Sequence, residues 1–134
     1  PKICLSAIYA NKFKKKTDFG NLEISREWNW CPEQVDFLYK FTQKKPQDFL
    51  LTNGKKFKAK TMLKYAFEYF KLNYKDYVTH NKKFLRKRDI SNVSSKYYEC
   101  LKRNSLKRTP KIYGKFLIYK LIKFYLKNDY FLNL

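Results

Sequence analysis

Residues able to do chemistry are sparse in this chain, and their spacing matches no complete catalytic site. His80 is the only histidine and stands between Thr79 and Asn81. No G-x-S-x-G or H-E-x-x-H pattern surrounds it, so neither a hydrolase triad nor a zinc site is predicted. The three glycines, Gly20, Gly54 and Gly114, stand singly, whereas a dinucleotide fingerprint needs its glycines within one strand-turn-helix. We therefore expect no cofactor to be bound by this chain alone.

Two tyrosine–lysine pairs have the Y-x-x-x-K spacing with which a lysine can lower the pKa of a catalytic tyrosine. They are Tyr98 with Lys102 and Tyr119 with Lys123. Chance alone accounts for both pairs in a sequence with 12 tyrosines and 26 lysines among 134 residues. Both pairs are interpreted as solvated helix faces.

The cysteines indicate free thiols in a reducing compartment. Cys4, Cys31 and Cys100 are odd in number and lack the C-x-x-C spacing of zinc or redox sites. The sequence also shows no apolar run long enough to span a bilayer and no cleavable leader. These features predict a cytoplasmic protein without a membrane partner.

The elements that must position these side chains are a mixture of helices and short strands, which predicts an α/β fold class (mixed α+β) in a single unit, residues 1–134. Apolar residues at helical spacing predict helices from the start of the chain, from Pro32 to near Lys44, over 58–72, over 93–104, and from Gly114 to near Asn128. Strands are expected over 22–25 and 48–52 and within 74–90, with turns at 17–21 and 53–54.

The net charge of +20 is the usual footprint of a nucleic-acid binder, but the composition weakens that inference. Lysine supplies 26 of the 31 basic residues, and Phe, Tyr, Ile, Lys and Asn together fill 67 of 134 positions. These five types have AT-rich codons, so a biased genome would raise all of them together. Arginine, the better residue for bidentate phosphate or base recognition, is scarce. We place genome bias ahead of nucleic-acid binding as the origin of the charge.

An ordered set of local patterns rises above this background. They are Pro1-Lys2-Ile3, then G-N-L-E-I-S-R-E-W at 20–28, then K-P-Q-D-F-L-L-T-N-G at 45–54, then Pro110-Lys111-Ile112. In this order they resemble the carboxy-terminal part of GDP-mannose 4,6-dehydratases, members of the extended short-chain dehydrogenase/reductase family. The likeness is closest from Phe19 to Ala66 and thins after residue 72.

The resemblance implies a substrate-binding role for four residues. Arg26 matches the family arginine of R-D-W, which reaches the nucleotide diphosphate, and Lys2 matches the lysine of T-R-K-I near the same nucleotide. Arg86 matches the arginine of Y-R-P-x-E, and Asp89 its acid. A guanidinium suits a diphosphate because it donates paired, charge-assisted hydrogen bonds.

Two departures leave the sugar open. Where the family has W-G-H-A-x-D-Y-V, this chain has Trp28-Asn29-Trp30-Cys31-Pro32-Glu33-Gln34-Val35, and Lys87 stands where the proline after Arg86 is expected. A GDP-linked heptose or another deoxysugar precursor is therefore as admissible as GDP-mannose.

The resemblance also implies what lies outside the chain. The family's cofactor fingerprint and catalytic tyrosine would stand before Pro1, which indicates a carboxy-terminal fragment without a complete Rossmann domain. The parent is implied to be an NADP-dependent lyase of deoxysugar biosynthesis that moves a hydride from sugar C4 to C6 around a dehydration. A homo-oligomer of the parent is one alternative. The isolated chain, which would need its missing cofactor-binding half, is expected to be inactive.

The rival hypothesis is a small lysine-rich nucleic-acid-binding module, which predicts aromatic side chains on an open, positively charged sheet face. The dehydratase hypothesis predicts instead that Phe49, Phe67 and Phe70 are buried and that Arg26 lies at a cleft. It also predicts apolar faces without partners on the helices at 33–43 and 58–72, the first formed by Val35, Leu38 and Tyr39.

Overall fold

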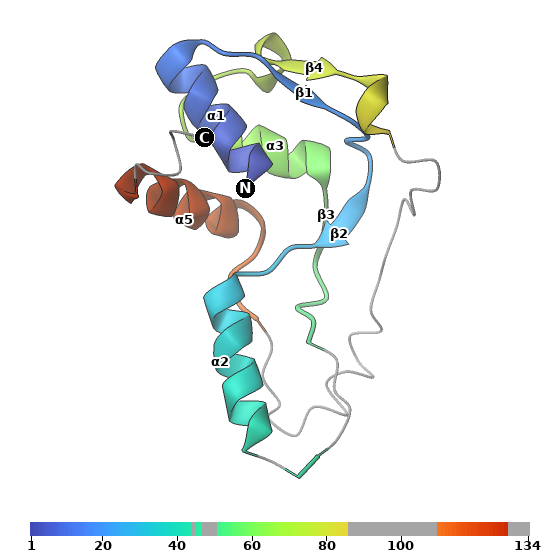
Figure 1. Cartoon of the computed structure of the whole chain (residues 1–134), viewed down its shortest axis with the longest axis vertical. Coiled ribbons are helices and arrows are strands. Elements are labelled where there is room, and N and C mark those ends of the chain that lie inside the picture. Colours follow the sequence, from blue (N-terminus) through green and yellow to red (C-terminus); the bar gives the residue numbers. More distant parts are fainter. Residues whose placement is uncertain (44, 47–50, 86–109, 129–134) are drawn as a thin grey trace.

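Three helices form the core of the molecule in the computed structural model, which describes residues 1–43, 45–46, 51–85 and 110–128. They are α1 (Lys2–Phe13), α3 (Ala59–Glu68) and α5 (Gly114–Lys127), and each packs against the other two (Figure 1). Their facing side chains are fully or almost fully buried: Cys4, Ala7 and Ile8 of α1, Met62, Leu63, Ala66 and Phe67 of α3, and Leu117, Ile118 and Ile122 of α5. Burial of each large apolar side chain contributes about 1.5–3 kcal/mol.

Two short pairs of strands flank this core. β1 (Thr17–Phe19) pairs in parallel with β4 (Val78–His80), and β2 (Ser25–Glu27) pairs antiparallel with β3 (Lys56–Lys58). The 3-10 turns around β4 are η1 (Tyr74–Asp76) and η2 (Lys82–Phe84), and the side chains of Asn73 and Asn81 cap them by accepting a main-chain hydrogen bond.

The remaining described helix, α2 (Cys31–Thr42), extends away from the core (Figure 1). Pro32 occupies its first turn, where a missing N–H costs nothing. The helix buries Phe37 and Phe41, while Val35, Leu38 and Tyr39 are 56%, 47% and 68% exposed. The predicted apolar face of α2 therefore has no partner within the described residues.

For the helix predicted over 58–72, the expectation of an apolar face without a partner is wrong. Its apolar side is covered by α1 and α5, so Met62, Leu63 and Phe67 are at most 1% exposed. The helix also ends earlier than predicted, at Glu68. The chain turns out of it through Lys71, which has a left-handed φ of 57°.

Several predicted strands and turns differ from the structure. Thr17–Phe19 is a strand rather than a turn, because the Thr17 N–H donates to the Tyr77 oxygen and the Phe19 oxygen accepts the Asn81 N–H. The second strand is Ser25–Glu27 instead of 22–25, and Lys56–Lys58 is a strand that the apolar pattern missed. Leu51 and Thr52 are in no strand, and residues 48–50 and the predicted helix over 93–104 lie outside the described residues.

The mixed α/β class is confirmed, and so are the first helix, α2, the last helix and a strand within 74–90. Within the described residues the strands form two separate pairs, not the continuous parallel sheet of a Rossmann domain. In that part of the chain no helix combines the length and apolarity that a membrane span requires.

Candidate functional site

Lys2 lies in the first turn of α1 with its ammonium group over two aromatic rings. Its Nζ is 5.0 Å from the ring centroid of Phe19 and 4.3 Å from that of Phe84. Such contacts hold a cation near the ring faces while its charge stays accessible to water. The Lys2 ammonium group thereby lies close to the end of β1 and to η2.

Asp18 of β1 lies near Lys2, and hydrogen bonds favour its charged form. The hydroxyl of Thr79 and, next in importance, the amide of Asn81 donate to this carboxylate and lower the pKa of Asp18 below its ordinary value. The nearby charge of Lys2 adds a smaller effect in the same direction. The ionised carboxylate of Asp18 attracts the ammonium group of Lys2.

A cavity of about 290 Å³ lies next to Lys2. Its wall is formed by the start of α1, residues 19–22, Ile24, Trp28 and apolar side chains of α3 and α5. Among the described lining residues Lys2 has the one charged side chain. An apolar hollow with a cation at its edge suits a ligand that has a flat or apolar body and an anionic group.

Arg26 lies at the centre of β2, half-buried, with Phe57 of β3 as its register partner. Its Nη1 donates to the main-chain oxygen of Ser25 at 2.8 Å. Ile24 and Trp28, two residues to either side, line the cavity, but Arg26 is not among its lining residues. The structure thus places Arg26 on the strand that borders the cavity, and Arg86 and Asp89 lie outside the described residues.

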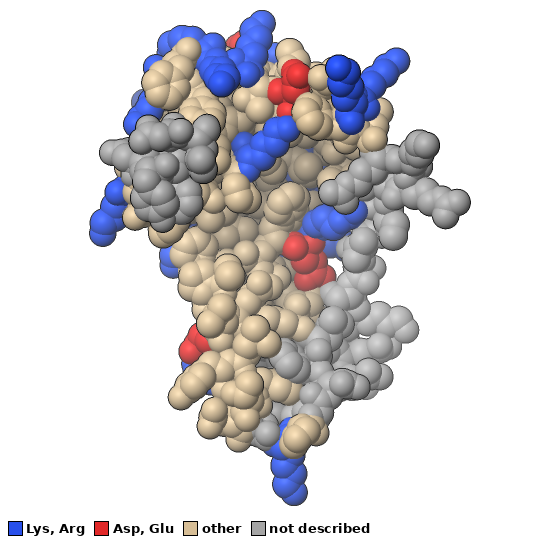
Figure 2. Space-filling view, in the orientation of Figure 1, with Lys and Arg blue, Asp and Glu red and all other residues tan. Residues whose placement is uncertain are grey.

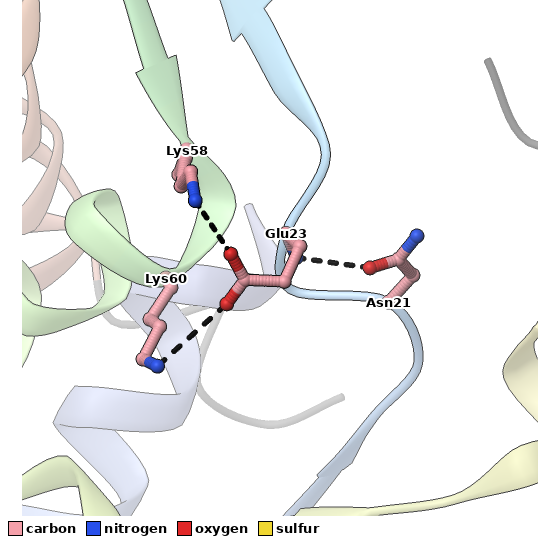
Figure 3. Close-up of polar contacts among 4 residues, drawn as sticks. All are labelled: Asn21, Glu23, Lys58 and Lys60. Atoms are coloured by element: carbon pink, nitrogen blue, oxygen red, sulfur yellow. Dashed lines mark hydrogen bonds and ion pairs between the residues drawn. The ribbon is translucent and has the colours of Figure 1, made fainter. Parts of the chain in front are cut away.

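A surface cluster joins the approach to β2 to the beginning of α3 (Figure 3). Glu23 binds Lys58 at 2.7 Å and Lys60 at 3.6 Å, and the Oδ1 atom of Asn21 accepts the Glu23 N–H at 2.9 Å. The bond from Lys58 is the main reason that the pKa of Glu23 lies below its ordinary value. All three charged side chains are more than half exposed, so the cluster orients the segment more than it stabilises the fold.

A more buried cluster forms around Glu27 of β2, a residue to which the sequence analysis assigned no role. The Glu27 carboxylate accepts hydrogen bonds from the Thr52 hydroxyl and from the main-chain N–H groups of Asn53 and Gly54. Thr52 and Asn53 are 2% and 5% exposed. The sequence shows an acid directly after Arg26 and a T-N-G turn further along the chain. Their spacing in the sequence does not reveal that the two are in contact.

Two of the other residues that the sequence analysis weighed, His80 and Tyr119, make ordinary contacts with neighbouring residues. His80 places Nδ1 3.2 Å from the main-chain oxygen of Phe19 at an exposed position, and no set of three metal-ligating side chains occurs among the described residues. The ring of Tyr119 packs edge to face on Tyr69, with centroids 4.9 Å apart. Tyr98 and Lys102 lie outside the described residues.

The described residues do not fit a dinucleotide cofactor. Gly20 lies against the main chain of Phe84, and Gly114 opens α5 against the ring of Phe57. Gly54 belongs to the turn held by Glu27. The three glycines thus serve three separate places, and together they make no phosphate-binding loop.

This mixed α/β arrangement of short strand pairs, an apolar cavity and a basic edge is consistent with part of a short-chain dehydrogenase/reductase-like domain. Comparison with known proteins makes this specific, because the model of the family "GDP-mannose 4,6 dehydratase" matches residues 2–111. The chain belongs to that family.

Two curated relatives give the extent of the likeness. GDP-mannose 4,6 dehydratase 1 of Arabidopsis thaliana is 29% identical over 79 residues, which cover 58% of this chain and 22% of the relative. GDP-mannose 4,6 dehydratase 2 of the same plant is 29% identical over 79 residues, 58% of this chain and 21% of the relative. The chain thus spans about a fifth of the length of the curated relatives it matches.

Proposed function

We propose that residues 1–134 form a single carboxy-terminal substrate-binding region of a GDP-mannose 4,6-dehydratase-like enzyme, and that this region binds a GDP-linked sugar. The observation that carries the proposal is the family match over residues 2–111, which includes both Lys2 and Arg26. The cavity beside Lys2 supports it, since an apolar wall with a cation at its edge suits a nucleotide.

Each named residue has a part in this proposal. Arg26 offers a guanidinium fork to the diphosphate, and Lys2 a point charge to the same group. Arg86 and Asp89 are the further substrate contacts that the resemblance implies. The sugar is GDP-mannose or a related precursor of deoxysugar biosynthesis.

The chemistry belongs to the larger enzyme in this account. A cofactor-binding half supplies NADP and the groups that transfer hydride and protons, and the assembled lyase works in the cytoplasm, as a homo-oligomer or a single copy. The chain on its own is expected to be inactive, because dehydration needs acid, base and cofactor positioned together.

The proposal predicts that the chain binds GDP-mannose and that Arg26→Ala weakens the binding about ten- to hundredfold, the equivalent of about 1.5–3 kcal/mol for hydrogen bonds to a charged group. Lys2→Ala should weaken it less, since an exposed ammonium contributes a screened charge. Isothermal titration calorimetry measures both dissociation constants.

Lys16→Ala is the matched control for these variants. It removes the same charge from an exposed position away from the cavity and should leave the dissociation constant unchanged. Equal losses in Lys16→Ala, Lys2→Ala and Arg26→Ala would mean that net charge alone attracts the nucleotide.

One observation favours the alternative, a lysine-rich module that binds nucleic acid. A groove of about 660 Å³ beside α3 is lined by Lys60, Lys64, Lys71 and Lys75, and its one carboxylate, Glu68, is bound to Lys115 at 2.7 Å. Yet the aromatic residues of the described strands, Phe19 and Phe57, pack toward the core and do not form an open sheet face. On the face that Figure 2 shows, the lysines spread around the end of the molecule that holds α1, β1 and β4.

A further inference from the structure

The Glu27 carboxylate organises the turn that precedes β3. Its Oε2 atom accepts from the Thr52 hydroxyl, from the N–H of Asn53 at 3.2 Å and from the N–H of Gly54 at 3.4 Å. The Thr52 Oγ1 atom also accepts the Gly54 N–H at 3.1 Å. One acid thus gathers the donors of three consecutive residues, in a place where Thr52 and Asn53 are almost completely buried.

Neighbouring bonds attach the same turn to the residues after Glu27. The Asn53 side-chain amide donates to the Oδ1 atom of Asn29 and to the main-chain oxygen of Trp28, and its Oδ1 atom accepts the Lys55 N–H at 2.6 Å. The indole N–H of Trp28 donates to the main-chain oxygen of Phe57 at 3.3 Å. These bonds fix the end of β2 against the chain that enters β3.

Arg26 directly precedes Glu27 in β2. Pairing with β3 holds β2 at Ser25 and Arg26, and the Ala59 N–H donates to the Ile24 oxygen at 2.9 Å. Side chains alternate along a strand, so Glu27 and Arg26 point to opposite faces of β2. Anchoring Glu27 on one face therefore sets the direction of the Arg26 side chain on the other.

We propose that Glu27 is a positioning residue for Arg26: the Glu27–Thr52–Asn53–Gly54 cradle aims the guanidinium at the diphosphate of the GDP-sugar. This inference rests on the proposed function of Arg26. A carboxylate that accepts several hydrogen bonds, some from main-chain N–H groups, is held firmly, because charge-assisted bonds are stronger than neutral ones. A ligand-binding side chain gains affinity when its support is fixed before the ligand arrives.

The test is a double-mutant cycle in which isothermal titration calorimetry measures the dissociation constant of GDP-mannose for each variant. Glu27→Ala should weaken binding about tenfold, the change that corresponds to loss of a buried hydrogen-bond acceptor. In the Arg26→Ala background the same substitution should have no further effect, since the group it positions is gone. Asp36→Ala, which removes an exposed acid on α2 away from the cavity, should leave the dissociation constant unchanged.

An equal loss from Glu27→Ala in both backgrounds would overturn the proposal, since Glu27 would then act without Arg26. No loss in the wild-type background would do the same. If Glu27→Ala fails to fold, Thr52→Val takes its place in the cycle, because it removes one donor of the cradle and keeps the carboxylate. Thr52→Ser, which keeps the hydroxyl, should restore binding.

A second readout separates this inference from the proposed function. If the wild-type chain does not bind GDP-mannose, the proposed function fails. The Arg26 Nε–Hε signal in the NMR spectrum then still tests whether the cradle orients the guanidinium. Glu27→Ala should shift this signal and speed the amide exchange of Asn53 and Gly54. An unchanged Arg26 signal would show that the cradle does not orient the guanidinium.

Discussion

At the scale of single residues, the sequence could identify the basic side chains but not the groups that hold them. Arg26 and Lys2 stand in recognisable local patterns, so their types and places could be predicted. The role of Glu27 could not, because its partners Thr52, Asn53 and Gly54 follow 25 to 27 positions later and meet it only through the pairing of β2 with β3. A contact across such a separation leaves no periodic signal in one sequence.

Cys4 gives a prediction about pH at this scale. Burial raises the pKa of its thiol from 9.0 to about 12. Above pH 9.0 the unfolded chain releases this proton while the folded chain keeps it, so the contribution of Cys4 to stability is complete below pH 9.0 and declines from there to about pH 12.

Urea unfolding on either side of pH 9.0 measures this effect. The free energy of unfolding of the wild type should fall by up to about 1.4 kcal/mol per pH unit more than that of Cys4→Ala. Cys31→Ala, at an exposed cysteine, should keep the wild-type dependence on pH. The same pH dependence in Cys4→Ala and in the wild type would contradict the assignment.

At the scale of elements, helices were easier to predict than strands for a physical reason. α3 and α5 carry apolar residues at helical spacing along one side, and the buried residues of both helices follow that spacing. The strands have three residues each, too few for an alternating pattern to show, and the central Phe57 of β3 stands between two lysines. Hydrogen bonding to a partner far away in the sequence makes them strands, and no local pattern reports such a partner.

Gly114 ties β3 to the start of α5 and can be tested by substitution. Its φ is 58°, and a Cβ atom there would lie 2.8 Å from Cζ of Phe57. Phe57 in turn stacks on Tyr113, with ring centroids 6.3 Å apart. Gly114→Ala should therefore lower the free energy of unfolding by about 1–3 kcal/mol, through backbone strain and displacement of the ring.

Lys123→Ala is the control for Gly114→Ala because it places alanine at an exposed position of the same helix. Thermal or chemical unfolding should show a change within about 0.5 kcal/mol for this variant. Two variants of equal stability would show that Gly114 is not constrained by Phe57.

At the scale of the whole molecule, the described residues combine a closed core with a helix that lacks a complete environment. α1, α3 and α5 cover one another, whereas α2 leaves Val35, Leu38 and Tyr39 exposed. The region of α2 in Figure 2 is mostly uncharged, in contrast to the lysine-rich end of the molecule. This agrees with a chain that spans about a fifth of the length of its curated relatives.

The family could be recognised from the order of short motifs, although the identity to the curated relatives is 29%. The position of the cavity could not be predicted, because it needs α1, residues 19–22 and α5 to meet. The sequence also could not predict which of the two apolar helix faces is buried. Periodicity shows that a helix has an apolar side but not which neighbour covers it.

The measurement that tests the central claim most directly is an NMR titration of the chain with GDP-mannose, read at the main-chain amides. If the chain binds the nucleotide sugar as proposed, chemical shifts should change at residues 2–4 and 19–28, around the cavity, Lys2 and Arg26. Shifts confined to the groove of Lys60, Lys64, Lys71 and Lys75, with the same response to a single-stranded oligonucleotide, would contradict the nucleotide-sugar account and favour the nucleic-acid module.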